Sequence, residues 1–140
     1  MGLLISTKHF PIVIKYVEVP LKNGDVGIYI IKGEEQEAKY KDKIKLLETQ
    51  WHKPTWKETM EVARDATVYD QYTGTREVDP LLHRALTIER FLKMWDIVDE
   101  NGNKVECNLD NIAKLDVAVA GALLEAFNSY NLPTEEQLKN

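Results

Sequence analysis

The sequence has 140 residues, the length of a single domain, and 44% of them are hydrophobic, which is enough to form a core. Its 18 basic and 23 acidic residues give a net charge of −5, which argues against nucleic-acid backbone binding as the main function. The single cysteine, Cys107, excludes an intrachain disulfide and a cysteine zinc cluster, and no apolar run approaches the roughly 18–20 residues that span a bilayer.

Residues 10–31 predict a two-stranded β-hairpin. Two runs rich in β-branched residues, Ile12–Val19 and Val26–Ile31, flank Asn23-Gly24, a pair that readily adopts a tight hairpin turn. The first run is apolar on both faces and needs a covering on each. A lone hairpin is marginal in water, so we expect it to pack on the helices, on a second copy or on a partner. The residues predicted for self-association are Ile12, Ile14, Tyr16, Val17, Ile28 and Ile30.

Residues 34–51 form the most charged segment and predict an amphipathic helix. Tyr40, Ile44, Leu47 and Trp51 recur at i, i+4, i+7 and i+11, which places them on one helical face. The charges alternate in sign, which favours a solvated surface over nucleic-acid or membrane binding.

Two further helices are marked by their first residues. Thr55 and Glu58 fit a capping box, and Asp79-Pro80 provides an N-cap followed by proline at the first helical position. A polar turn, residues 70–75, separates them. The second of these helices is expected to continue through Trp95. Its predicted buried residues are Leu81, Ala85, Ile88, Leu92 and Trp95.

The last third predicts a turn and two more helices. Asn101-Gly102 suggests a tight turn, and Asn108 or Asp110 is expected to cap a short helix. Asp116 is predicted to start the final helix. Its expected core face is Val117, Ala120, Leu124 and Phe127, and the small residues Ala118, Ala122 and Ala126 would let another helix approach closely.

These elements predict an α+β fold that is mainly α. An N-terminal hairpin segment (1–33) precedes a helical domain (34–132) built as a compact bundle of about four to five helices, and residues 133–140 form a C-terminal tail. We expect a single globular unit.

The sequence offers no set of residues that predicts catalysis or a cofactor. If Gly102 stood at the sixth position of a calcium loop, Ile97 and Asn108 would occupy positions that require carboxylates. His9, His52 and His83 lie in separate segments, and neither a nucleophile motif nor a phosphate-binding glycine loop is present. We therefore predict no enzyme activity and no catalytic, metal-binding or cofactor-binding residues.

The chain from Trp56 to Leu132 resembles the tail assembly chaperones of tailed bacteriophages. That family carries a helix closing on a Trp-Asp or Trp-Asn element, an acidic glycine turn, an Asn-Ile helix start and a C-terminal helix rich in Ala and Leu. The counterparts here are Trp95-Asp96, Asp99 to Gly102, Asn111-Ile112 and Val117 to Phe127. The N-terminal third has no counterpart in that pattern.

The resemblance implies a non-enzymatic role in phage tail assembly in the host cytoplasm. Such chaperones keep the tape measure protein soluble and help to recruit tail tube subunits. An apolar groove would receive helical segments of the partner. The predicted partner-binding residues are Trp56, Met60, Tyr69, Tyr72, Leu92, Trp95, Leu124 and Phe127. The second hypothesis is a structural virion component (a connector, tail or capsid accessory protein) that forms a homo-oligomer through the hairpin. Neither hypothesis involves direct nucleic-acid or membrane binding.

Overall fold

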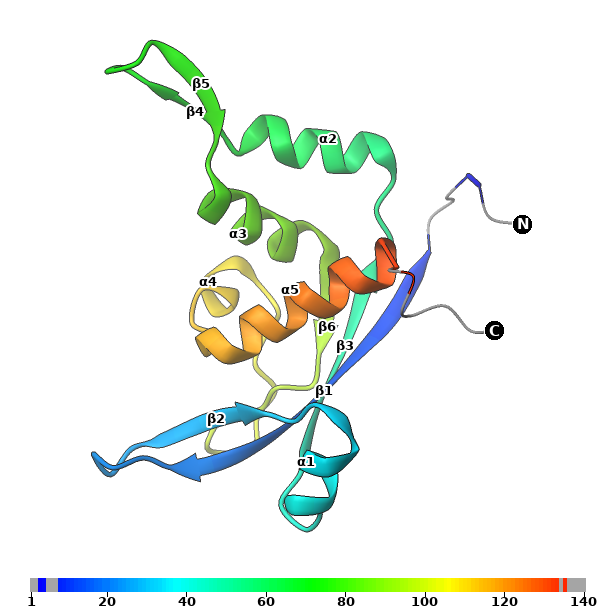
Figure 1. The fold of residues 1–140 in the computed structure, drawn as a ribbon, viewed down its shortest axis with the longest axis vertical. Coiled ribbons are helices and arrows are strands. Elements are labelled where there is room, and N and C mark those ends of the chain that lie inside the picture. Colours follow the sequence, from blue (N-terminus) through cyan, green and yellow to red (C-terminus); the bar gives the residue numbers. More distant parts are fainter. Residues whose placement is uncertain (1–2, 5–7, 134, 136–140) are drawn as a thin grey trace.

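A computed structural model describes residues 3–4, 8–133 and 135 of the chain, and Figure 1 shows its fold. The tail expected at 133–140 lies almost entirely outside the described residues. The strands are β1 (His9–Pro20), β2 (Val26–Ile30), β3 (Lys45–His52), β4 (Thr67–Asp70), β5 (Thr75–Val78) and β6 (Leu92–Trp95). The helices are α1 (Gly33–Lys39), α2 (Trp56–Asp65), α3 (Pro80–Phe91), α4 (Leu109–Ile112) and α5 (Val117–Asn131).

The centre of the fold is a four-stranded antiparallel sheet with the order β2-β1-β3-β6. The expected hairpin is present, and Gly24 in its turn has a φ of 90°. Its long first strand then pairs on its other side with β3, so that Ile12 lies opposite Thr49 and Ile14 opposite Leu47. The hairpin is therefore half of a larger sheet.

The predicted fold class is wrong in its main point. The structure is α+β, with 38% helix and 30% strand, and it is neither mainly α nor a hairpin followed by a helical bundle. The reason is that two segments predicted as helix, within 34–51 and at 92–95, form the strands β3 and β6 beside the hairpin.

The segment 34–51 shows how the pattern misled the prediction. Only the short helix α1 forms at its start, and β3 follows. In β3 the residues Leu47, Thr49 and Trp51 are buried and alternate with exposed neighbours, which is the period of a strand. Leu47 and Trp51 are four residues apart, a spacing that suits one helical face and one strand face equally well.

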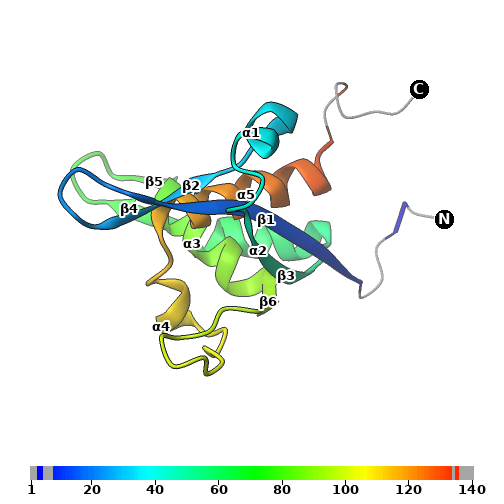
Figure 2. The ribbon, with the colours of Figure 1, turned by 90° about the horizontal axis from the view of Figure 1, so that it is seen from below.

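The first strand of the hairpin carries buried side chains on both of its faces. On one face, Ile12 and Ile14 belong to the main core, which also includes Phe127 of α5. On the other face, Val17 is fully buried and lies opposite Tyr29, whose hydroxyl accepts a hydrogen bond of 2.9 Å from the Gln36 side chain of α1. In Figure 2, α1 and α4 lie on opposite sides of β1.

The predicted helix starts are confirmed. Thr55 and Glu58 form a reciprocal capping box on α2. The side chains of Asp79, Asn108 and Asp116 cap α3, α4 and α5 by accepting hydrogen bonds from backbone amides in the first turn of each helix.

Helix α3 ends earlier than predicted, at Phe91, because the chain switches to the strand β6. Leu92 is buried as expected, but from a strand that pairs with β3. Leu81 is 74% exposed and Ala85 is also exposed, although both were predicted to be buried. Because these two side chains are exposed, α3 has an apolar face that is open to solvent.

The core face of α5 also differs from the prediction. The buried residues are Val119, Leu123, Leu124 and Phe127, and Val117 is 87% exposed. The predicted small-residue stripe is approached by the sheet instead of a helix, because α5 contacts β1 and β2.

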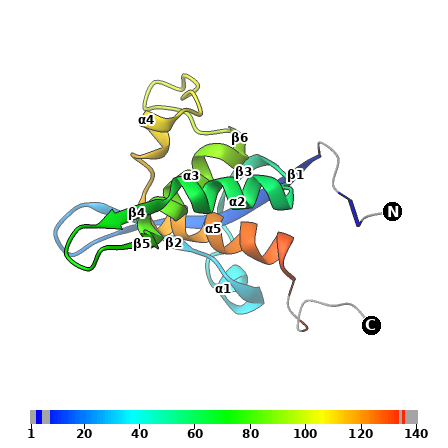
Figure 3. The same cartoon turned by 90° about the horizontal axis from the view of Figure 1, so that it is seen from above.

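Strands β4 and β5 form a second, two-stranded sheet that the sequence prediction missed. They flank the turn predicted at 70–75, where Gly74 has a φ of 70°. Figures 1 and 3 show this hairpin projecting from the body on the same side as the β1–β2 hairpin. Helices α2, α3 and α5 are stacked from top to bottom in Figure 1.

Candidate functional site

A mainly apolar groove lies between α3, α4 and α5 and has a volume of about 310 Å³. We call it the α3–α5 groove. From α3 it is lined by Leu81, Arg84, Ala85 and Ile88, and from the region of α4 by Leu109, Ile112, Ala113 and Leu115. From α5 it is lined by Val117, Ala120, Gly121 and Leu124. Arg84 is the only charged residue of this lining.

Local helix chemistry places the groove walls. The caps Asp79, Asn108 and Asp116 start all three helices, which meet near their N-terminal ends. Below them, Ile88 and Leu124 are buried in the main core and form the floor. At the rim, Leu81, Leu109 and Val117 are 74%, 53% and 87% exposed. Apolar side chains on a helix are normally turned to the core, so an exposed set around one hollow marks a candidate contact surface.

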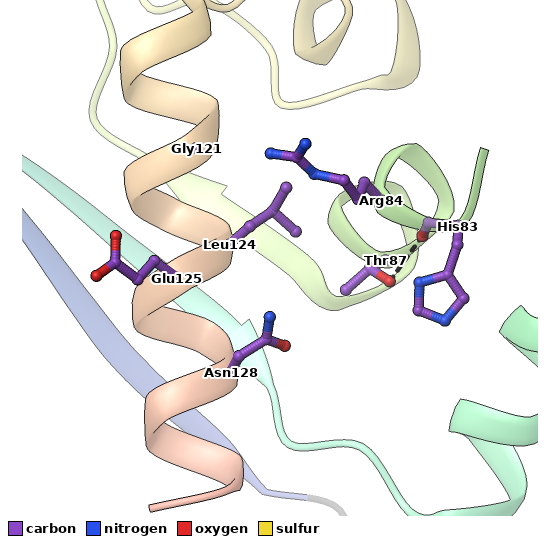
Figure 4. A pocket seen from close by; sticks show the side chains of 7 residues that line it. All are labelled: His83, Arg84, Thr87, Gly121, Leu124, Glu125 and Asn128. Atoms are coloured by element: carbon purple, nitrogen blue, oxygen red, sulfur yellow. Dashed lines mark hydrogen bonds between the residues drawn. The ribbon is translucent and has the colours of Figure 1, made fainter. Parts of the chain in front are cut away.

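The groove continues into a more polar hollow of about 380 Å³ between α3 and α5. His83, Thr87, Glu125 and Asn128 line this end. Arg84, Gly121 and Leu124 line both hollows and therefore stand at the boundary between them. Figure 4 shows Arg84 extending from α3 toward Gly121 and Leu124 of α5.

Gly121 keeps the middle of the groove open. A glycine inside a helix is less stable than alanine by roughly 0.5–1 kcal/mol. Close packing of a neighbouring element often explains such a glycine, but a Cβ atom added to Gly121 would meet nothing within 4 Å. The absence of a side chain here therefore serves no contact inside the chain and leaves room for a second molecule.

The predicted partner-binding residues fall into two groups. Trp56, Met60, Tyr69 and Tyr72 are exposed on α2 and on the β4–β5 hairpin, with Tyr72 at 93%. Leu92, Leu124 and Phe127 are buried in the core, and Leu124 also lines the groove. Trp95 is partly buried, and its indole N–H donates a 2.7 Å hydrogen bond to the carbonyl of Val105. Of the eight, only Leu124 lies in the α3–α5 groove.

The six residues predicted for self-association are buried or partly buried by other parts of the same chain. Ile12, Ile14 and Val17 are buried, and Tyr16, Ile28 and Ile30 are partly buried against the main core. A surface for a second copy would therefore have to come from other residues.

The histidines that lay apart in the sequence are partly brought together. His9 and His52 face each other across β1 and β3 with ring centroids 6.0 Å apart. The Nε2 atom of His52 lies 2.9 Å from both carboxylate oxygens of Glu58. Partial burial raises the pKa of Glu58, but hydrogen bonds from His52 and Thr55 outweigh it and hold that pKa below the ordinary value. This arrangement secures the start of α2.

The remaining polar residues that were weighed for chemistry have local structural roles. The Asp99 carboxylate accepts hydrogen bonds from the backbone amides of Asn101 and Asn103, as expected for a polar turn. Cys107 is half-buried, and burial raises the pKa of its thiol while nearby Lys93 partly offsets the rise. Among the residues that the structure describes, no cluster of three or more His, Cys, Asp or Glu side chains could hold a metal ion.

Sequence reasoning missed most of the groove because it assigned Leu81, Ala85, Val117 and Ala120 to the core. A signal existed in Gly121, because a glycine inside an apolar helix often has a packing or functional reason. The residues from α4 could be found only from the three-dimensional arrangement.

Comparison with protein-family models gives no match, and comparisons with curated proteins and with solved structures likewise give none. None of the helices in the described part of the chain combines the length and the hydropathy that crossing a membrane requires.

Proposed function

We propose that this chain is a non-enzymatic phage morphogenesis protein, a tail assembly chaperone that binds helical segments of the tape measure protein in its α3–α5 groove. The observation that carries the proposal is the groove itself, an apolar hollow with three exposed aliphatic side chains on its rim. The phage assignment rests on the sequence resemblance from Trp56 to Leu132, and recruitment of tail tube subunits follows from the same resemblance.

The shape and chemistry of the groove suit an amphipathic helix. Its walls come from the helices α3, α4 and α5, and helices pack at interaxial distances of about 8–10 Å. Small residues such as Ala85 and Gly121 would face the partner. A bound helix would place apolar side chains at i, i+3, i+4 and i+7 over the floor formed by Ile88 and Leu124.

The available surface indicates a weak complex that forms and dissociates readily. Full burial of an aliphatic side chain contributes about 1.5–3 kcal/mol. Weighted by their exposed fractions of 74%, 53% and 87%, covering Leu81, Leu109 and Val117 contributes about 3–6 kcal/mol in all. Association itself costs several kcal/mol. A micromolar dissociation constant requires about 8.2 kcal/mol, so we expect a constant weaker than micromolar for one helix. That suits a chaperone, which has to release its client.

Co-expression with the tape measure protein of the same phage tests this proposal. The soluble fraction of the tape measure protein should rise with the wild-type chain and should not rise with Gly121→Leu, which fills the groove. The matched control is Ala38→Leu, which adds the same side chain at an exposed position of α1. If Gly121→Leu solubilises the client as well as the wild type does, the groove is not the binding site.

Mass spectrometry of purified phage particles separates the proposal from a structural virion component. A chaperone is absent from finished particles or present only in traces. Stoichiometric presence would favour the virion hypothesis and contradict the proposal.

A further inference from the structure

Building on the proposed function, we infer that Arg84 selects the bound segment by pairing with an acidic side chain on it, so that the client of the groove is an amphipathic helix carrying a carboxylate beside its apolar stripe. Arg84 would then be the residue that sets specificity and register, while the apolar lining supplies most of the affinity.

The position of Arg84 carries this inference. It lines both the apolar groove and the polar hollow and extends toward Gly121 and Leu124, across the space that a client would occupy (Figure 4). A guanidinium is always charged and presents a planar fork of donors that matches a carboxylate. Its location at the boundary fixes where the acidic residue of a bound helix must lie.

The charge of Arg84 is not neutralised by the acidic residues that the structure describes. Among the described residues, Arg84 has no carboxylate within ion-pair distance. The nearby acid of the polar hollow, Glu125, pairs instead with Lys32 at 3.2 Å. A client carboxylate would therefore meet Arg84 without displacing an existing ion pair.

The groove also favours a peptide carboxylate over a free small anion. The rest of the apolar lining is uncharged and offers aliphatic surface. A free anion would interact with the guanidinium alone. A helix would interact with the guanidinium and also with the aliphatic surface. Apolar contact on the rim would also exclude water from the ion pair, and such a pair depends less on salt than a fully exposed one does.

Overlapping 20-residue peptides of the tape measure protein of the same phage serve as the probe. Fluorescence anisotropy of each labelled peptide with the full-length chain identifies the tightest binder, whose Asp and Glu residues are then neutralised one at a time to Asn and Gln. We expect one neutralisation to weaken binding about tenfold, as Arg84→Glu should for the unaltered peptide. A peptide with Lys at that one position should bind Arg84→Glu better than the wild type.

Two controls keep the outcomes distinct. Lys57→Glu makes the same change of charge on the exposed side of α2 and should leave the affinity within about twofold, since distant exposed charges are screened. Gly121→Leu should abolish binding of every peptide that enters the groove.

The results then separate the two proposals. Loss of binding in Gly121→Leu, with no response to Arg84→Glu or to any neutralised acid, would overturn the role of Arg84 and leave the groove in place. If no peptide binds, or if binding survives Gly121→Leu, the proposed function of the groove fails, and the inference about Arg84 fails with it.

Discussion

Substitution of Gly121 by leucine should stabilise the fold and abolish client binding. Glycine inside a helix is less stable than alanine by about 0.5–1 kcal/mol, and leucine lies within a few tenths of alanine. Because a Cβ at position 121 would meet nothing within 4 Å, this helical gain is not offset by a clash of the Cβ with the chain. We expect the free energy of unfolding to rise by about 0.5–1 kcal/mol, or the melting temperature by about 2–5 °C.

Thermal unfolding by calorimetry and peptide binding by anisotropy measure the two effects on one sample. Gly121→Ala should give a similar stabilisation with a smaller loss of affinity, because its side chain fills less of the groove. A lower melting temperature for both variants would refute the reasoning, since it would mean that the chain itself occupies the groove in solution. A stable Gly121→Leu with unchanged client affinity would refute the assignment of the site.

Three further predictions concern stability and reactivity. The pKa of Glu58 in the folded state lies below its ordinary value of 4.5, so its ionised form stabilises the fold above that pH, and the contribution is lost as the pH falls through the folded-state pKa. Glu58→Gln should therefore cost about 0.5–1.5 kcal/mol in urea unfolding at neutral pH, and this cost should shrink as the pH falls below 4.5. A cost that stayed the same at every acidic pH would contradict this role of the carboxylate. Thr49→Val should cost about 1–3 kcal/mol in the same assay. The Thr49 hydroxyl accepts a 2.7 Å hydrogen bond from the buried Trp51 indole and donates one to the carbonyl of Ile12, and the variant loses both. A cost below about 0.5 kcal/mol would exclude that role. Cys107 should react with a thiol reagent at pH 7.5 more slowly than the same chain in denaturant, since burial raises the pKa of its thiol, and equal rates would show that it is exposed.

The parts of the fold that could be predicted from the sequence are those set by local chemistry. The capping box of Thr55 and Glu58 and the N-cap of Asp79 depend on hydrogen bonds that span two or three residues, so their pattern was sufficient. The Asn23-Gly24 turn was predictable for the same reason, because Gly24 has a positive φ.

The strands β3 and β6 could not be predicted because their pairing partners decide them. The buried Thr49 looks polar in the sequence, yet its hydroxyl donates to the carbonyl of Ile12 on the neighbouring strand β1 and accepts from the indole of Trp51 on its own strand. Likewise Leu92 continues the helical pattern of α3 but lies opposite Trp51 in the sheet. Long-range pairing outweighed local propensity at both places.

The groove could not be predicted from the sequence for a related reason. Leu81 and Val117 fit the apolar stripes of two helices, and such stripes normally point to the core. In the structure the core is filled by the neighbouring residues Ile88 and Leu123, so these two side chains are left on the rim. Which apolar side chains are buried in the core and which stay exposed depends on how α3, α4 and α5 pack together.

Mapping backbone amide shifts by NMR, on the isotopically labelled chain titrated with its tightest-binding tape measure peptide, would locate the binding surface residue by residue. We predict that the perturbed amides cluster on the groove residues of α3, α4 and α5, around Leu81, Arg84 and Gly121, with a dissociation constant weaker than micromolar. Perturbations confined to the exposed side of α2 and the β4–β5 hairpin, where Trp56 and Tyr72 lie, would contradict it.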